Sequence, residues 1–136
     1  QAAGGGSLPT PVCITLWQND AIMVWSNMPA ALTEFRATLN TRTKVDLTNS
    51  TQSRITVRQA AAAYAGSQLK VQYSTDDATW YDLCAVALST SANVTLAGTW
   101  TNVPAGAKAD VYIRLVGIAG DGVVDPTFGL ITCQIK

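Results

Sequence analysis

An acidic loop toward the end of the chain has residue types that could hold a metal ion. Residues 120–126 read GDGVVDP and place Asp121 four positions before Asp125. Calcium takes about six to eight oxygen ligands, usually from several carboxylates in a longer loop. Two carboxylates alone provide fewer ligands than calcium needs. The glycines at 120 and 122 and the proline at 126 are also typical of a plain turn. The turn is the favoured interpretation, with Asp121 and Asp125 kept as weak metal candidates.

Paired carboxylates could also act as the general acid and base of a glycosidase. Such a pair must face each other across a sugar, about 5–10 Å apart. Asp76 and Asp77 are adjacent in the sequence, and neighbours in a tight turn point apart, so a hairpin turn is favoured. Asp82, Asp110 and Glu34 leave open a pair that forms only in space.

The chain contains no histidine. This absence removes the usual general base, the Ser-His-Asp and Cys-His arrangements and the commonest zinc ligand. Cys13, Cys84 and Cys133 have no C-x-x-C spacing, so no cysteine-based metal motif is present. We therefore expect a protein that is not an enzyme, with no catalytic residue and no cofactor. Cys13 and Cys133 fall in the first and last expected strands and could pair, or all three could be small buried residues.

Four tryptophans are the strongest candidates for a binding surface. Exposed aromatic rings on a sheet face can form a sugar-stacking platform or a subunit interface, whereas buried rings simply pack in the core. We take Trp17, Trp25 and Trp100 as candidate interface residues, with core packing as the alternative for each. Trp80, beside a predicted hairpin turn, is more typical of a cap over the core.

The elements that position these residues are mostly β-strands. Alternating apolar and polar residues over 53–58, 69–74, 110–115 and 131–135 predict strands with one buried face. Weaker strand candidates are residues 12–17, 21–25, 44–48, 80–85 and 94–101. About nine short strands with recurrent turns predict an all-β fold, a single antiparallel β-sandwich of jelly-roll type.

One segment has helical spacing. Leu32, Phe35 and Leu39 fall at i, i+3 and i+7 after Asn27 and Pro29. This pattern predicts at most one short helix, capped by Asn27 or Ser26 with the proline near its first turn.

The first eleven residues differ from the rest in composition. Three consecutive glycines and two prolines within residues 1–11 predict a flexible arm, because such a segment buries too little apolar surface to order itself. Residues 12–136 form the expected β-sandwich domain. Leu8, Pro9 and Pro11 are candidate contacts of the arm with a neighbouring subunit.

Most of the chain, from about Trp25 to Lys136, resembles a family of small virion proteins of tailed phages. The similar stretches are TKVDLTN at 43–49, LKVQYSTD at 69–76 leading to Trp80, ADVYIRLVGI at 109–118, GDG at 120–122 and DPTFG at 125–129. The resemblance implies a capsid decoration, head-fibre or tail-associated β-sandwich that is exposed on the particle surface. It carries over no catalytic residue.

Composition limits the possible partners. Nine basic residues balance nine acidic ones, which gives zero net charge, and only 13% of residues are charged. Nucleic-acid binding normally needs a basic excess, and no apolar run is long enough for a membrane span. We therefore expect neither nucleic acid nor membrane as a partner. The expected function is a non-enzymatic virion component that binds a major capsid or tail protein and forms homo-oligomers. The alternative is a carbohydrate-binding module for attachment to host glycans.

Overall fold

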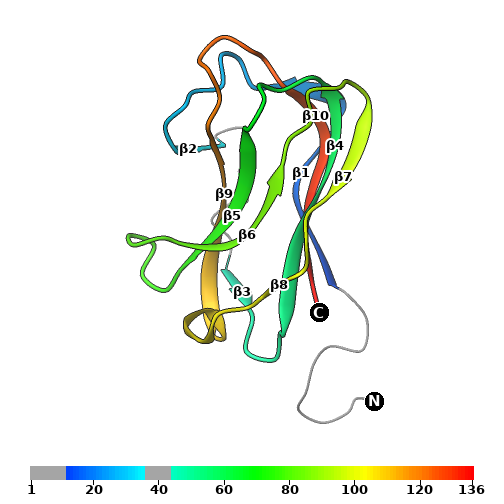
Figure 1. Cartoon of the computed structure of the whole chain (residues 1–136). Helices are drawn as coiled ribbons and strands as arrows, with labels where there is room; N and C mark the ends of the chain where they lie inside the picture. Colours follow the sequence, from blue (N-terminus) through cyan, green and yellow to red (C-terminus); the bar gives the residue numbers. More distant parts are fainter. Residues whose placement is uncertain (1–11, 36–43) are drawn as a thin grey trace.

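The computed structural model describes residues 12–35 and 44–136, and within the first strand it leaves out the side chains of residue 12 and residues 16–23. Two antiparallel sheets face each other across an apolar core (Figure 1). Sheet A has the strand order β1-β10-β4-β7, with β8 also paired to β4. Sheet B has the order β2-β9-β5-β6, with β3 also paired to β9. The predicted antiparallel β-sandwich is confirmed.

Most connections cross from one sheet to the other, as in a jelly roll. Sheet A contains β1 (Val12–Val24), β4 (Gln52–Ala61), β7 (Val94–Ala97), β8 (Thr101–Asn102) and β10 (Thr127–Ile135). Sheet B contains β2 (Thr33–Glu34), β3 (Lys44–Asp46), β5 (Gln68–Ser74), β6 (Tyr81–Ala87) and β9 (Asp110–Ile118). The chain changes sheet after β1, β3, β4, β6, β8 and β9, whereas β5 and β6 form a hairpin within sheet B.

The core forms where the apolar faces of the two sheets meet. Strand alternation places Ile55 and Val57 of β4 opposite Val71 of β5 and Leu115 of β9, and all four side chains are buried. Burying side chains of this size stabilises the fold by about 1.5–3 kcal/mol each before entropy is counted. The alternating sequence pattern is therefore the main reason that these segments become strands of a sandwich.

The predicted helix is absent from the part of its range that the structure describes. Asn27 adopts a left-handed φ of 52° in a turn, and Thr33–Glu34 is β2, paired with Gly117 and Val116 of β9. Phe35 donates its backbone N–H to the carbonyl of Leu115 at 2.8 Å, so pairing with β9 overrides the weak helical spacing. Leu39 lies outside the described residues. A three-residue 3₁₀ turn, η1 (Ala105–Ala107), is the only helix that the structure describes, and no described helix could cross a membrane.

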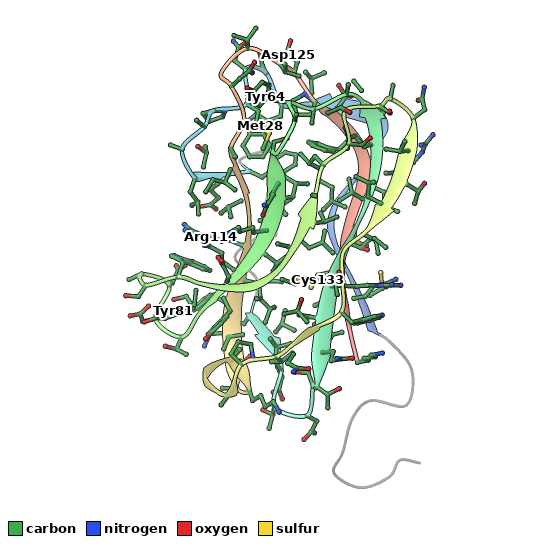
Figure 2. All side chains as sticks on the ribbon, in the orientation of Figure 1. Met28, Tyr64, Tyr81, Arg114, Asp125 and Cys133 are labelled. Carbon is green, nitrogen blue, oxygen red and sulfur yellow. The ribbon has the colours of Figure 1, made fainter. Side chains whose placement is uncertain are left out.

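Cys13 and Cys133 lie on neighbouring strands but on opposite faces of sheet A. Cys13 pairs with Gln134 and Ile14 pairs with Cys133, so the two cysteines are one position out of register. One position in a strand turns a side chain to the other face. Cys13 is therefore exposed, whereas Cys133 lies between the sheets (Figure 2), and all three cysteines are free thiols.

Candidate functional site

The interface candidates of the N-terminal region lie largely beyond what the structure describes. Leu8, Pro9 and Pro11 are outside the described residues. Trp17 belongs to β1, where its backbone is opposite Ile131 of β10, but its side chain is not described. Among the described strands, β1 lies at the edge of sheet A, and residues 1–11 directly precede it in the sequence.

Trp25 is not a surface residue. The residue is only 9% exposed, and its ring lies 5.0 Å from the ring of Phe35, measured between centroids. A Cβ at Gly117 would come within 2.6 Å of the Trp25 ring, so β9 accepts this ring only because glycine is there. The interface assignment of Trp25 is therefore corrected: the side chain fills the core, as in the alternative interpretation.

Asp121 and Asp125 hold the β9–β10 loop together. Asp121 Oδ1 accepts hydrogen bonds from the backbone N–H groups of Val123 and Val124, both at 2.9 Å. These bonds favour the charged form and lower the pKa of Asp121. Asp125 Oδ1 accepts a 2.7 Å bond from the Asn27 N–H. No group of three or more possible metal ligands occurs among the described residues. Asp121 is an acceptor within its own turn, whereas Asp125 joins the loop to the distant turn at Asn27.

Asp76 has the same kind of role in the β5–β6 hairpin. Its Oδ1 accepts hydrogen bonds from the N–H groups of Ala78 and Thr79, both at 2.9 Å, and from the Ser74 hydroxyl at 2.8 Å. These bonds, of which the one from Thr79 is the strongest cause, lower the pKa of Asp76 to about 2. Asp76 is therefore a turn acceptor that stays ionised.

Trp100 is the interface candidate with the most distinctive surroundings. It precedes β8 at one end of sheet A and is partly exposed. The Arg54 guanidinium carbon lies 4.6 Å from the ring centroid and the Lys136 ammonium nitrogen lies 4.4 Å from it. Both distances are within the range of a cation–π contact, so two cations are gathered around one indole ring.

The outer face of sheet A extends away from this tryptophan as a surface of small, mostly neutral side chains. Strand pairing forms one row from Thr15, Thr132, Thr56 and Ala97. The hydroxyls of Thr56 and Thr132 are hydrogen bonded to each other. The flanking rows contain Cys13, Gln134 and Arg54 on one side, and Leu130, Arg58 and Thr95 on the other.

The charges on this face are all positive in the part that the structure describes. Arg54, Arg58 and Lys136 form no ion pair with a described carboxylate, and Arg54 donates its Nε–H to Gln134 Oε1 at 2.7 Å. The one acidic residue in the strands of sheet A is Asp20, and its side chain is not described. The sequence reasoning missed this cluster, although Arg54, Thr56 and Arg58 share the polar face of one predicted strand.

Sheet B carries a different arrangement, in which the charges are linked. Arg114 donates to Gln72 Oε1 from Nε at 3.0 Å and from Nη2 at 2.8 Å, and its Nη1 lies 3.7 Å from Glu34 Oε1. Gln72 Nε2 donates to Asp82 Oδ1 at 2.9 Å, and Lys70 Nζ contacts Asp82 Oδ2 at 3.0 Å. This chain of contacts, the sheet B network, has its polar groups satisfied within the protein.

Trp80 lies beside the sheet B network. The Arg114 guanidinium carbon is 4.5 Å from its ring centroid. The neighbouring Tyr81 is 55% exposed and points away from the sandwich (Figure 2), with its ring 5.7 Å from that of Tyr73. The hairpin therefore presents one open aromatic ring, at a residue that the sequence reasoning did not single out.

Comparison with known proteins supports the fold and nothing finer. No protein-family model matches the sequence, and no curated protein matches it. Among solved structures, the chain is similar to Eiger TNF from S. frugiperda, with a TM-score of 0.50 and 10% sequence identity. The match covers 93% of this chain and 92% of that chain. At this identity the likeness shows a shared β-sandwich of jelly-roll type.

Proposed function

We propose that the protein is a non-enzymatic structural component of a phage virion, a capsid decoration or surface-displayed module that binds the particle and associates with its own copies. The observation that carries the self-association is the outer face of sheet A. Its described side chains are small hydroxyls, an alanine, a thiol, a glutamine amide and an exposed leucine, with cations but no carboxylate side chain. The assignment to a virion rests on the resemblance of residues 25–136 to small tailed-phage proteins.

The size of this face is sufficient for a specific contact. Its four main strands lie about 4.8 Å apart; a nine-residue strand such as β10 is about 30 Å long, whereas the four-residue β7 is about 14 Å long. One copy would therefore contribute about 500 Å², and two copies about 1,000 Å². This total is about the size expected of a small biological interface, so we expect association of moderate strength that repeated copies on a particle reinforce.

The test is the solution mass, measured by size-exclusion chromatography with light scattering over a range of concentrations. We expect a dimer or larger species at about micromolar concentration, as for a small standard interface. Thr15→Tyr places bulk on the exposed part of sheet A and should give a folded monomer. Thr90→Tyr, in the exposed loop between β6 and β7, is the matched control and should assemble normally. A wild-type protein that stays monomeric at every concentration and does not bind particles would contradict the proposal.

The N-terminal arm gives an independent test of particle binding. Deletion of residues 1–11 should leave a domain with unchanged thermal stability that is no longer incorporated into particles. Normal incorporation of the truncated protein would remove the arm from the mechanism, while leaving sheet A as the contact surface.

A second candidate function is binding of host glycans, favoured by the exposed Tyr81 ring beside Trp80. An exposed aromatic ring of this kind is suited to sugar stacking. A titration of intrinsic fluorescence against a broad glycan panel tests this function, with Tyr81→Ala as the variant that should lose the response. A flat titration across the panel would count against glycan binding.

A further inference from the structure

We propose that one end of the outer face of sheet A is a binding site for a phosphate group carried by a saccharide. The Trp100 site, as it is called here, consists of the Trp100 ring, the two cations that contact it, Arg54 and Lys136, and the neighbouring amide side chains of Gln52, Asn102 and Gln134. The inference goes beyond the proposed function, because a single copy of the chain holds every group of the site.

Strand pairing brings the polar side chains of the Trp100 site to one face. Arg54 of β4 lies opposite Gln134 of β10. Lys136 directly follows β10 and lies opposite Gln52, and the backbone N–H of each donates to the carbonyl of the other at 3.0 Å. Asn102 of β8 pairs with Gln52 from the other side of β4. Because alternate residues of a strand share a face, these five side chains lie together on the outer surface of sheet A.

The connection between β7 and β8 places the indole ring at this surface. Gly98 donates its N–H to the carbonyl of Ile55 at 2.8 Å, and β8 then pairs with the start of β4. A Cβ at Gly98 would come within 2.5 Å of the Ala85 carbonyl oxygen, so glycine allows this segment to pass close to β6. The backbone on both sides of Trp100 is therefore attached to β4, which fixes the ring beside Arg54.

The two cations are close together, and no described carboxylate neutralises them. The Arg54 guanidinium carbon and the Lys136 ammonium nitrogen lie 4.6 and 4.4 Å from the same ring centroid, so they are at most 9.0 Å apart, the sum of the two distances. Neither forms an ion pair with a described carboxylate. Arg54 donates its Nε–H to Gln134 Oε1 at 2.7 Å, and its two terminal amino groups have no acceptor among the described residues.

The one acidic residue in the strands of sheet A is far from these cations along the strands. Asp20 follows Gln18 in β1, and Gln18 lies opposite Leu130 of β10. Leu130 is four residues from Gln134, which is about 13 Å along a strand. The described side chains of the Trp100 site therefore carry two positive charges and no negative one.

A phosphate monoester matches the charge and the donors of the Trp100 site. Near pH 7 it carries a charge of about −1.5 to −2 and three acceptor oxygens. The terminal amino groups of Arg54 and the ammonium group of Lys136 are suitable donors, and charge-assisted hydrogen bonds of about 2.7–2.9 Å on either side of a phosphate can bridge two cations at this separation. A carboxylate carries a single negative charge and would leave one of the two cations without a counter-charge.

The amides around the cations favour a phosphate that is attached to a saccharide. Gln134 Nε2, Gln52 Oε1 and Asn102 Nδ2 make no hydrogen bond to another described residue. They are therefore free donors and acceptors for sugar hydroxyl groups. The Trp100 ring is partly exposed beside them, and an aromatic ring provides an apolar surface for the C–H groups of a sugar.

The experiment titrates the tryptophan fluorescence of the full chain with glucose 6-phosphate at submicromolar protein, where self-association does not contribute. We expect saturable binding with a Kd of about 1 mM, an affinity within reach of a ligand of this size. Saturation-transfer NMR of the ligand detects binding independently of any tryptophan signal. Absence of binding by both methods would overturn the proposal.

Two variants test the cations of the Trp100 site. Arg54→Gln and Lys136→Gln keep polar side chains but remove one charge each, and each should weaken the affinity at least about tenfold. Lys108→Gln, which removes an exposed cation outside sheet A, is the matched control and should bind within about twofold of wild type. Circular dichroism and thermal melting establish that each variant is folded. Unchanged affinity in Arg54→Gln and Lys136→Gln would overturn the site.

Three further ligands test the chemistry of the occupant. Glucose lacks the charge, glucuronic acid carries one negative charge, and inorganic phosphate lacks the sugar, so each should bind at least about fivefold more weakly than glucose 6-phosphate. Equal binding of glucuronic acid would contradict the match to a doubly charged group. Equal binding of inorganic phosphate would contradict the saccharide. These titrations are decided independently of the solution mass, so a failure of self-association and a failure of the Trp100 site are distinguishable.

Discussion

Arg114 on sheet B and Arg54 on sheet A each lie over a tryptophan ring, with the guanidinium carbon 4.5 and 4.6 Å from the ring centroid. Their other neighbours differ. Arg114 also contacts Gln72 and the carboxylate of Glu34, whereas the one hydrogen-bond partner of Arg54 among the described side chains is the neutral Gln134. A cation stacked on an indole ring therefore does not by itself indicate a binding site. What distinguishes the two arginines is whether a carboxylate within the chain also neutralises the guanidinium charge.

The same difference extends over the two faces. On sheet B, charged side chains from neighbouring strands are joined through Gln72, which is almost completely buried. On sheet A, the described polar contacts between strands join two neutral groups, as in the Thr56–Thr132 hydroxyl pair, or a cation and a neutral group, as in Arg54 and Gln134. We infer that the polar residues of sheet B chiefly stabilise the fold, while those of sheet A are available for contacts outside the chain.

The largest expected effect contrasts two glycines on equivalent central strands. In Gly117→Ala on β9, the new Cβ would lie 2.6 Å from the Trp25 ring and 2.8 Å from the Met28 methyl group, so we expect a loss of about 3 kcal/mol. In Gly129→Ala on β10, the nearest neighbour is the Arg58 side chain at 3.8 Å, so we expect a change within about 0.5 kcal/mol. Urea denaturation of both variants measures the difference. Equal losses of stability in the two variants would mean that Gly129 on β10 is packed as tightly as Gly117 on β9.

Next in size is the removal of the cation from the sheet B network. The Arg114 side chain is 17% exposed, and Arg114→Leu removes both hydrogen bonds that Arg114 donates to Gln72 Oε1 and the ion pair with Glu34. Because groups left unsatisfied when buried are costly, we expect a loss of about 2 kcal/mol in the free energy of unfolding. The double variant Arg114→Leu/Gln72→Leu should cost less than the sum of the single changes, since the two residues are coupled. Full additivity would show that the network is not a unit.

Acid should destabilise the hairpin of sheet B before it affects sheet A. The pKa of Asp76 is about 2 in the folded chain against an ordinary value of 3.8. A carboxyl whose folded pKa is depressed stabilises the fold above its unfolded pKa, and this contribution is lost as the pH falls through about 4 toward 2. Melting temperature measured across that range should fall, and Asp76→Asn should flatten the fall. Hydrogen exchange should locate the earliest acid-induced opening at residues 74–80 rather than in β4 or β10. Earliest opening in sheet A would contradict the assignment.

The strands β4, β5, β9 and β10 were predictable from the sequence. Apolar residues at every second position share one face of a strand, and the strand is stable when that face is buried. The pairing of β2 with β9 was not, because Leu32 and Phe35 also fit a helix and only a distant strand decides between the two. For the site, Trp100 was predictable as a residue type. Its environment was not, because Arg54 and Lys136 are brought to it from strands at separate places in the sequence. Trp25 was misassigned because exposure depends on Gly117, far along the chain, leaving room for the ring.

The smallest effect is expected at Arg58, which tests the idea that the cations of sheet A are not needed by the fold. Arg58 is exposed, and it makes no ion pair with a described carboxylate. Arg58→Ala should therefore change the free energy of unfolding of the monomer by at most about 0.5 kcal/mol, and added salt should not alter this small difference. Denaturation at concentrations too low for assembly measures the monomer alone. A loss comparable to that of Arg114→Leu would mean that Arg58 is bound within its own chain. The proposed contrast would then be wrong, in which sheet B pairs its charges within the chain and sheet A leaves its cations available for contacts with other molecules.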